Sequence, residues 1–321
     1  MENFDNNNQD NNEPDLNENK SGSLNELTPA IPPLTAGFFG LIAIFILYQI
    51  GGGLLTLMIF GMDVENADVN LVRLLTMGGQ VMFILFPALL LTKLVYQDVT
   101  RVIRLKIPSI GEILFFTIGL IILTPLLQNL IYIQDYIFKQ LADAVPIINS
   151  LKELLDQFGE LVEKTYTKML SSSSFVESAF IVLVVAVTPA ICEEVFFRGY
   201  LQKSFELKTG KFLGALITAI FFGLYHFNPY GFIGLTILGL YFGFVTYTSN
   251  SILIAVVLHF LNNFIAIVAY LTFGTEDILS SEIANTDSIG LNVISFFLLL
   301  SIFFTFIYYA KKKYNDPLTN K

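Results

Sequence analysis

Cysteine, histidine and charged residues are all scarce in this sequence of 321 residues. The single cysteine, Cys192, excludes an intramolecular disulfide. Charged residues make up 14% of the chain, against roughly 25% in soluble domains, and 54% of the residues are hydrophobic. These proportions exclude an ordinary soluble domain and predict a polytopic membrane protein.

The start of the chain lacks the basic stretch of a secretory signal peptide, so we expect the first apolar run to remain as a membrane span. Residues 1–30 hold seven acids and one lysine, and therefore carry −6 of the formal net charge of −9. Residues 1–35 are rich in asparagine and poor in large apolar side chains. We expect them to form a disordered acidic tail, because burial cannot offset the entropy lost on ordering. The negative charge therefore belongs to a tail rather than to the body of the protein, and it argues only weakly about partners. No nucleic-acid partner is expected.

Eight apolar stretches are candidate transmembrane helices, because about 20 apolar residues cross a bilayer. They are residues 36–60, 75–97, 111–134, 175–207, 212–229, 231–248, 251–273 and 288–310. The fold class predicted is therefore an all-α membrane bundle of about eight transmembrane helices that occupies residues 36–310. The connections between residues 175 and 273 are very short, which predicts a tight antiparallel bundle.

Basic residues cluster after the second, fourth and eighth of these stretches. The three clusters are Arg101, Arg104 and Lys106; Lys203, Lys208 and Lys211; and Lys311, Lys312 and Lys313. For eight spans all three fall on one side, whereas the loop 275–287 on the other side is acidic. Because cytoplasmic loops are rich in lysine and arginine, we expect both termini to be cytoplasmic and residues 311–321 to form a basic cytoplasmic tail. The asparagine-rich start favours a bacterial inner (plasma) membrane.

Residues 135–174 have an amphipathic pattern in which leucines and Phe158 alternate with charged residues at helical spacing. This pattern predicts an interfacial helix on the outer side of the membrane. A solvated lid or loop helix fits the same pattern equally well.

Two adjacent carboxylates, Glu193 and Glu194, lie in the fourth apolar stretch, where charge is costly and usually functional. On a helix, Glu194 and Arg198 are four residues apart and share a face, so they are expected to form a structural ion pair. Glu193 points about 100° away and has no local cation, which leaves it as a candidate general base. Pro189 is expected to kink the helix one turn earlier.

The only two histidines, His226 and His259, lie in the fifth and seventh apolar stretches, and Asn263 is one helical turn after His259. A carboxylate, two imidazoles and an amide on three helices are the parts of a hydrolase. Glu193 and His226 are suited to hold and deprotonate a water, and His259 and Asn263 to stabilise an oxyanion. Asn263 could instead bond a neighbouring helix, with Asn262 beside it as a substitute. Counting along the spans puts Glu193 towards the cytoplasmic half but His226 nearer the outer end, which leaves the depth of the site open.

Three motifs occur in order: Glu-Glu-x-x-x-Arg at 193–198, Phe-x-x-x-His at 222–226 and His-x-x-x-Asn at 259–263. This arrangement resembles the CAAX prenyl protease and bacteriocin-processing (CPBP, or Abi) family of intramembrane proteases, over about residues 175–268. The resemblance implies a membrane endopeptidase with eight spans and a peptide or protein substrate, either CAAX-type or bacteriocin-like. It also implies that Glu193, His226, His259 and Asn263 are catalytic, and that Glu194 and Arg198 belong to the signature.

A metal ion is a possible cofactor, because the family is commonly labelled metalloprotease. Glu193, His226 and His259 are the residues that would ligate Zn²⁺. The chain lacks a His-Glu-x-x-His motif, and a glutamate-dependent mechanism needs no ion. The metal-free mechanism is therefore slightly preferred.

Other functions and other readings of the motifs remain open at this point. A proton-coupled transporter would use the same groups as a relay, but no obvious internal repeat supports it. A non-enzymatic scaffold or bacteriocin-immunity protein of the same family is a further alternative. Gly239-x-x-x-Gly243 predicts a helix-packing seam. Residues 51–53, three glycines, indicate either a flexible point near a lateral entrance or a close helix crossing.

Overall fold

A computed structural model describes residues 27–62, 67–273 and 289–315. These residues are all helical apart from their connections. Most of the expected acidic tail, the acidic loop 275–287 and the last residues of the basic tail lie outside the described residues.

Seven helices among the described residues are long and apolar enough to cross a membrane, so the chain is an integral multi-pass membrane protein. They span Pro33–Phe60, Val69–Tyr96, Ile110–Ala144, Phe175–Thr209, Phe232–Ser249, Ile252–Phe273 and Ile289–Tyr314. The stretch predicted at 212–229 is instead the shorter helix α11, Lys211–Tyr225, of 15 residues. At 1.5 Å per residue this helix is about 22 Å long, less than the roughly 30 Å of a bilayer core.

Several of the long helices contain short π-helical segments, so each is described in parts. The first long helix comprises α1 (Pro33–Phe45), a π segment (Ile46–Gly51) and α2 (Gly52–Phe60); the second comprises α3 (Val69–Gln80), a π segment (Val81–Leu85) and α4 (Phe86–Tyr96), followed by α5 (Val99–Val102). The helix of Phe175–Thr209 comprises α8 (Phe175–Ile181), a π segment (Val182–Val187), α9 (Thr188–Glu194), a second π segment (Val195–Leu201) and α10 (Gln202–Thr209). The remaining helices are α6 (Ile110–Ala144), α7 (Pro146–Leu170), α12 (Phe232–Ser249), α13 (Ile252–Phe273) and α15 (Ile289–Asn315).

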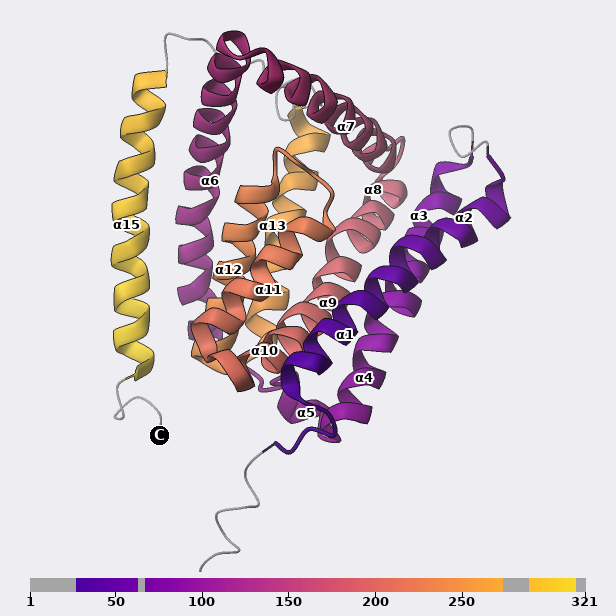
Figure 1. The fold of residues 1–321 in the computed structure, drawn as a ribbon, viewed down its shortest axis with the longest axis vertical. Helices are drawn as coiled ribbons and strands as arrows, with labels where there is room; N and C mark the ends of the chain where they lie inside the picture. The colour runs from indigo at the N-terminus through magenta and orange to yellow at the C-terminus, as the bar shows by residue number, and fades with distance from the viewer. Residues whose placement is uncertain (1–26, 63–66, 274–288, 316–321) are drawn as a thin grey trace, which may run out of the picture.

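The long helices run up and down, and α7 crosses their upper end (Figure 1). Helix α15 stands beside α6 on one side of the bundle, and α1 to α4 form the opposite side (Figure 1). The three elements that carry the basic clusters, namely α5, the α10–α11 turn and the end of α15, all lie at the lower end (Figure 1).

Helix boundaries follow from local chemistry. Ser109 and Glu112 form a reciprocal capping box that starts α6. Asp68 and Ser174 cap α3 and α8 by accepting a hydrogen bond from a backbone amide of the first turn. Gly210 separates α10 from α11 with φ +86°, a conformation that glycine adopts without strain. The tight turn lets α10 and α11 pack side by side as an antiparallel hairpin.

The buried core surrounds the middle of the helix that contains both glutamates. Phe196, Phe197, Tyr200 and Phe205 are all almost fully buried there. Phe222 of α11 packs against Phe197, with ring centroids 5.2 Å apart. This aromatic packing fixes the rotation of α9 and α10 about their axis, and so fixes the directions in which the glutamates point.

The amphipathic segment expected at 135–174 is divided between two helices. Its first ten residues belong to α6, which continues to Ala144, and the amphipathic helix itself is α7. On the apolar face of α7, Leu151, Leu154, Phe158 and Leu161 are 48%, 50%, 51% and 62% exposed. The described part of the bundle therefore leaves this face uncovered, and both the interfacial helix and the solvated lid stay predictions.

Arg73 ties the far end of α7 to the bundle. Its guanidinium is fully buried and pairs with Glu177 of α8 at 3.0 Å. Its Nε donates to the carbonyl of Met169 in the last turn of α7, at 3.0 Å. One side chain of α3 thereby joins the end of α7 to the start of α8.

Candidate active site

Glu193 and Glu194 end the α-helical segment α9, which lies between two π segments. A π turn adds a residue to the helix and locally widens it, and such turns are frequent at functional sites. The first of the two π segments, Val182–Val187, ends two residues before Pro189, where the sequence predicts a kink. In an α-helix the carbonyl of Val185 would accept a hydrogen bond from residue 189, but Pro189 has no amide hydrogen. The preceding residue, Thr188, also donates its hydroxyl to the carbonyl of Leu183 at 2.8 Å.

Asn263 of α13 binds the backbone near Pro189. Its Nδ2 donates to the carbonyl of Val185 at 3.0 Å, and its Oδ1 accepts from Nδ2 of Asn262 at 3.2 Å. Asn263 therefore bonds a neighbouring helix, as one of the two sequence interpretations expects. One of the two amide hydrogens of Asn263 is used in this bond, and the other is left for further contacts.

Glu194 forms the predicted ion pair with Arg198, and it also binds a histidine. Its Oε1 accepts from a terminal nitrogen of Arg198 at 2.9 Å and lies 2.8 Å from Nδ1 of His259. The side chains of Glu194 and Arg198 are fully buried and that of His259 is 5% exposed. The Oε2 atom of Glu194 has no hydrogen-bond partner among the described residues.

Arg198 is held from three sides. A second terminal nitrogen donates to the carbonyl of Gly239 in α12 at 3.1 Å. The guanidinium carbon lies 4.3 Å from the centroid of the Phe222 ring, in a cation–π contact. The ring of Phe242 stacks on His259 with centroids 5.6 Å apart. Glu194, Arg198 and His259 therefore form a buried, rigid triad.

Glu193 lies against the other histidine. Its Oε2 is 3.9 Å from Nε2 of His226, too far for a direct hydrogen bond. The side chains of Glu193 and His226 are 15% and 23% exposed, whereas the Oε2 atom of Glu193 is buried. Oε2 of Glu193 has no hydrogen-bond partner within the described part of the chain.

The backbone of α11 orients the ring of His226. Nδ1 of His226 lies 2.7 Å from the carbonyl of Phe222, which only accepts, so Nδ1 carries the proton. Nε2 of a neutral His226 then presents a lone pair towards Glu193. Two acceptor atoms, one from each residue, consequently face each other across 3.9 Å.

The loop that carries His226 is anchored from above by α6 and α7. The carbonyl of Tyr230 accepts from Nε2 of Gln134 at 3.1 Å, and the hydroxyl of Tyr230 donates to Asp156 of α7. Burial acts to raise the pKa of Asp156, but the hydrogen bonds from Lys152 and Tyr230 outweigh it and hold that pKa below its usual value. The Asp156 carboxylate is thus a charged anchor for the loop.

Two tyrosines that sequence reasoning missed interact electrostatically with Glu193. The charge of Glu193 acts on the hydroxyls of Tyr48, in the first long helix, and of Tyr166, in α7. Tyr48 also forms a side-chain hydrogen bond with Gln80. Nothing in the sequence signals either tyrosine, since both come from outside the three motifs.

A groove of about 220 Å³ lies beside Tyr48, between the first two long helices. Its lining includes Gly52, Gly53, Thr76 and Phe83. A Cβ added at Gly52 or Gly53 would meet no described atom within 4 Å, so the close helix crossing expected as one explanation of these glycines is wrong.

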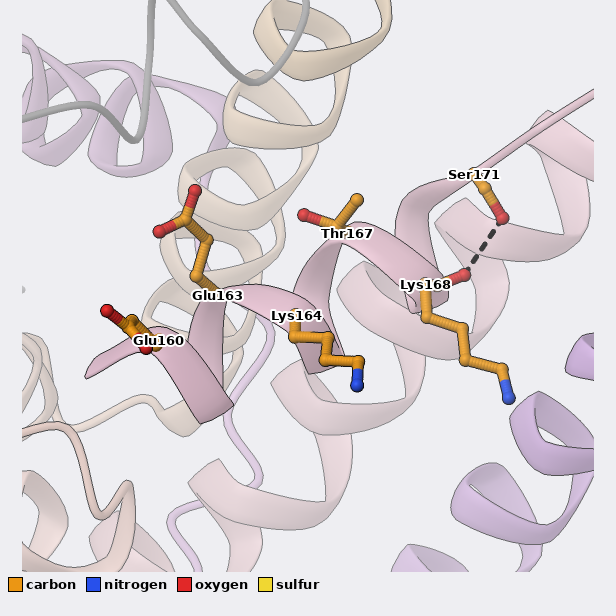
Figure 2. Close-up of a pocket in the computed structure, with 6 residues that line it drawn as sticks. All are labelled: Glu160, Glu163, Lys164, Thr167, Lys168 and Ser171. Carbon is orange, nitrogen blue, oxygen red and sulfur yellow. Dashed lines mark hydrogen bonds between the residues drawn. The ribbon is translucent and has the colours of Figure 1, made fainter. Parts of the chain in front are cut away.

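A larger hollow, of about 500 Å³, lies along α7, and neither Glu193 nor Glu194 lines it. It is lined by Glu160, Glu163, Lys164, Thr167, Lys168 and Ser171 (Figure 2). None of the predicted site residues lines it, and its walls belong to the polar face of a single helix (Figure 2). The candidate site therefore stays with Glu193 and His226.

The three residues named as possible Zn²⁺ ligands do not converge. Among the described residues, no group of three or more His, Cys, Asp or Glu side chains is placed to hold a metal ion. His226 faces Glu193, whereas Nδ1 of His259 is bound to Glu194. The arrangement does not fit a three-ligand zinc site, and no catalytic step is derived through a metal.

Comparison with protein families gives a match to the model described as Type II CAAX prenyl endopeptidase Rce1-like, over residues 175–265. The matched segment contains all three motifs and both histidines. Comparison with curated proteins and with solved structures gives no match.

Proposed function

We propose that this protein, in which residues 175–265 are an Rce1-like type II CAAX prenyl endopeptidase (CPBP) family domain, is an intramembrane endopeptidase that hydrolyses a peptide bond by means of a glutamate-activated water. Membership of this family indicates a peptidase, and the seven long apolar helices indicate that it acts in a membrane. The observation that carries the mechanism is the 3.9 Å separation of Glu193 Oε2 and His226 Nε2.

Two facing acceptors are suited to hold one water molecule between them. A water that donates one hydrogen to Glu193 and the other to His226 satisfies both atoms. Its own lone pairs then point away from Glu193 and His226, where a substrate carbonyl would approach. The geometry therefore supports an oriented nucleophile, which is the requirement for general-base hydrolysis.

The reaction proceeds by addition and elimination. The water oxygen forms a bond to the carbonyl carbon of the peptide as Glu193 accepts one of its protons. The carbon–nitrogen bond then breaks, and the proton held by Glu193 passes to the leaving amine. The products are a carboxylic acid and an amine, and Glu193 returns to its ionised form.

His259 and Asn263 are the proposed stabilisers of the oxyanion formed in the first step. Nδ1 of His259 is bound to Glu194, so its Nε2 is the nitrogen left to donate. Both ring nitrogens donate only in the imidazolium form, in which the single carboxylate of Glu194 faces two cations, the imidazolium and Arg198. Asn263 contributes the amide hydrogen that its bond to Val185 does not use.

A membrane-anchored peptide is the proposed substrate, either CAAX-type, as the family description suggests, or bacteriocin-like. A substrate held at the membrane could enter sideways, and the groove beside Tyr48 opens between the first two long helices. The elements that carry the basic clusters share the lower end of the bundle, which supports cytoplasmic termini (Figure 1). The proposed location is a bacterial plasma membrane, which the asparagine-rich start of the chain favours.

Replacing Glu193 with glutamine tests the mechanism. Glu193→Gln keeps the size of the side chain and removes the base, so the rate of peptide hydrolysis should fall at least about 100-fold. Purified protein in vesicles would be incubated with a lipid-anchored peptide, and products would be counted by mass spectrometry. Glu160→Gln, a matched change on the polar face of α7, should cleave like the parent. Equal rates for Glu193→Gln and the parent would rule out the proposed base.

A further inference from the structure

Four basic side chains gather where three of the long helices end. Lys203 interacts electrostatically with Arg101, Arg104 and Lys211. These four residues, here termed the basic end cluster, lie in α5 (Arg101), just after it (Arg104), in the first turn of α10 (Lys203) and at the start of α11 (Lys211). The ends of membrane-crossing helices mark the level of the lipid headgroups.

The acidic groups near the basic end cluster already have partners. Glu206 forms an ion pair with Arg104 and accepts a hydrogen bond from Gln202 at 2.7 Å. Asp98 caps α5, where it accepts from the backbone amide of Arg101 at 3.1 Å. Among the described residues, these four cations and two engaged carboxylates give the cluster a net positive charge.

Arg104 is the fixed member of the basic end cluster. Its side chain is 4% exposed, and its backbone carbonyl accepts from the amide of Ile252, at the start of α13, at 3.1 Å. One terminal guanidinium nitrogen of Arg104 is buried without a hydrogen-bond partner among the described residues. An uncompensated buried donor is destabilising, and a nearby anion would offset part of its cost.

We propose that the basic end cluster binds the phosphate of an acidic membrane phospholipid. Arg101 and Lys211 are exposed and Lys203 is half-buried, so their charged ends can extend to the headgroup level while their stems stay against the helices. Arg104 supplies positive charge from beneath. Basic residues at the ends of membrane helices each attract acidic lipid with about 1 kcal/mol. This proposal does not depend on the proposed protease activity.

Lipid titration of the purified full-length protein tests the proposal. Native mass spectrometry in a neutral detergent would measure the affinity for phosphatidylglycerol, for phosphatidylcholine with the same acyl chains, and for inorganic phosphate. We expect tight binding of phosphatidylglycerol alone. The double variant Lys203→Gln/Lys211→Gln should bind it about 30-fold more weakly, which corresponds to the loss of two such attractions.

The control variant Lys311→Gln/Lys312→Gln removes the same charge from the other basic segment at this end of the bundle. It should keep the affinity of the parent, and an equal loss in both double variants would overturn the proposal in favour of general charge attraction. If inorganic phosphate bound as tightly as the lipid, the site would be one for a free anion. Should Lys203→Gln/Lys211→Gln fail to fold, Arg101→Gln, with an exposed side chain, should weaken binding about fivefold, and an unchanged affinity would overturn the proposal.

Discussion

Glu193 and Glu194 are chemically identical neighbours in different surroundings. Glu194 is fully buried, and its Oε1 binds both Arg198 and His259. Glu193 is 15% exposed, and its Oε2 lies 3.9 Å from Nε2 of His226. Consecutive residues of a helix point about 100° apart, so one position is directed into the core and the next into the accessible site. The same substitution should therefore affect stability strongly at Glu194 and little at Glu193.

Glu194→Gln should destabilise the protein, because it leaves Arg198 buried without its countercharge. Loss of one partner of a buried ion pair costs about 3–5 kcal/mol. Glu193→Gln should change the free energy of unfolding by less than about 0.5 kcal/mol. Denaturant-induced unfolding in detergent micelles measures both. Equal destabilisation by the two variants would contradict the separation of a structural from a catalytic glutamate.

The contact between α12 and the helix of the glutamates depends on two glycines. The carbonyl of Gly239 accepts from Arg198 and that of Gly243 accepts from Gln202, each at 3.1 Å. Polar residues four apart on one helix thus meet glycines four apart on the other. The predicted packing seam is confirmed, and it lies inside this bundle.

Gly239→Ala should lower the thermal unfolding midpoint. The added Cβ would lie 3.0 Å from Cδ1 of Phe222 and 3.1 Å from a guanidinium nitrogen of Arg198. Overpacking of this kind costs about 1–3 kcal/mol. Gly234→Ala on the same helix is the control, because its Cβ would meet only Ile131, at an ordinary 3.5 Å. That variant should be neutral or more stable, and a control as unstable as Gly239→Ala would show that crowding is not the cause.

Across the whole molecule, α7 is attached by polar contacts while its apolar face is left uncovered. Arg73 holds its far end through the carbonyl of Met169, and Asp156 holds its middle through Tyr230. Because Tyr230 belongs to the loop that follows His226, the attachment of α7 and the position of His226 are linked.

The attachment of α7 should weaken in acid. A carboxyl whose pKa is lowered in the folded state contributes stability above its unfolded pKa, roughly 3.9, and loses that contribution as the pH falls through the folded value. Amide exchange in α7 should therefore rise below about pH 4. Asp156→Asn should show the faster exchange already at neutral pH, whereas Glu163→Gln on the polar face of α7 (Figure 2) should match the parent. Parental exchange in Asp156→Asn at both pH values would contradict this role.

Sequence reasoning found what helical periodicity determines and missed what packing determines. The Glu194–Arg198 pair follows from a spacing of four residues, and the long apolar runs identify the seven long helices. The bond between His259 and Glu194 joins residues 65 positions apart, and no local pattern reveals which glutamate the ring will reach. Asn263 is attached to Val185 by a carbonyl that Pro189 leaves without its usual partner, which a proline in an apolar run only hints at.

The relative depth of Glu193 and His226 in the membrane follows from the sequence when both are counted from the turn at Gly210. Sixteen residues lie between Glu193 and Gly210, and fifteen lie between Gly210 and His226. In a hairpin that turns at Gly210, nearly equal distances bring the two residues to the same level. Counting from the expected membrane edges instead gave two different depths.

Because the hairpin turns at Gly210, the position of His226 depends on the number of residues in α11 more than on which residues they are. One residue inserted between Gly210 and Tyr225 would turn His226 by about 100° around the axis of α11 and carry it about 1.5 Å along it. Most apolar substitutions on the outer surface of the same helix leave that geometry unchanged. Relatives that keep this chemistry should therefore vary in the amino acids on the outer surface of α11. The number of residues between the glutamates and the histidine should stay constant.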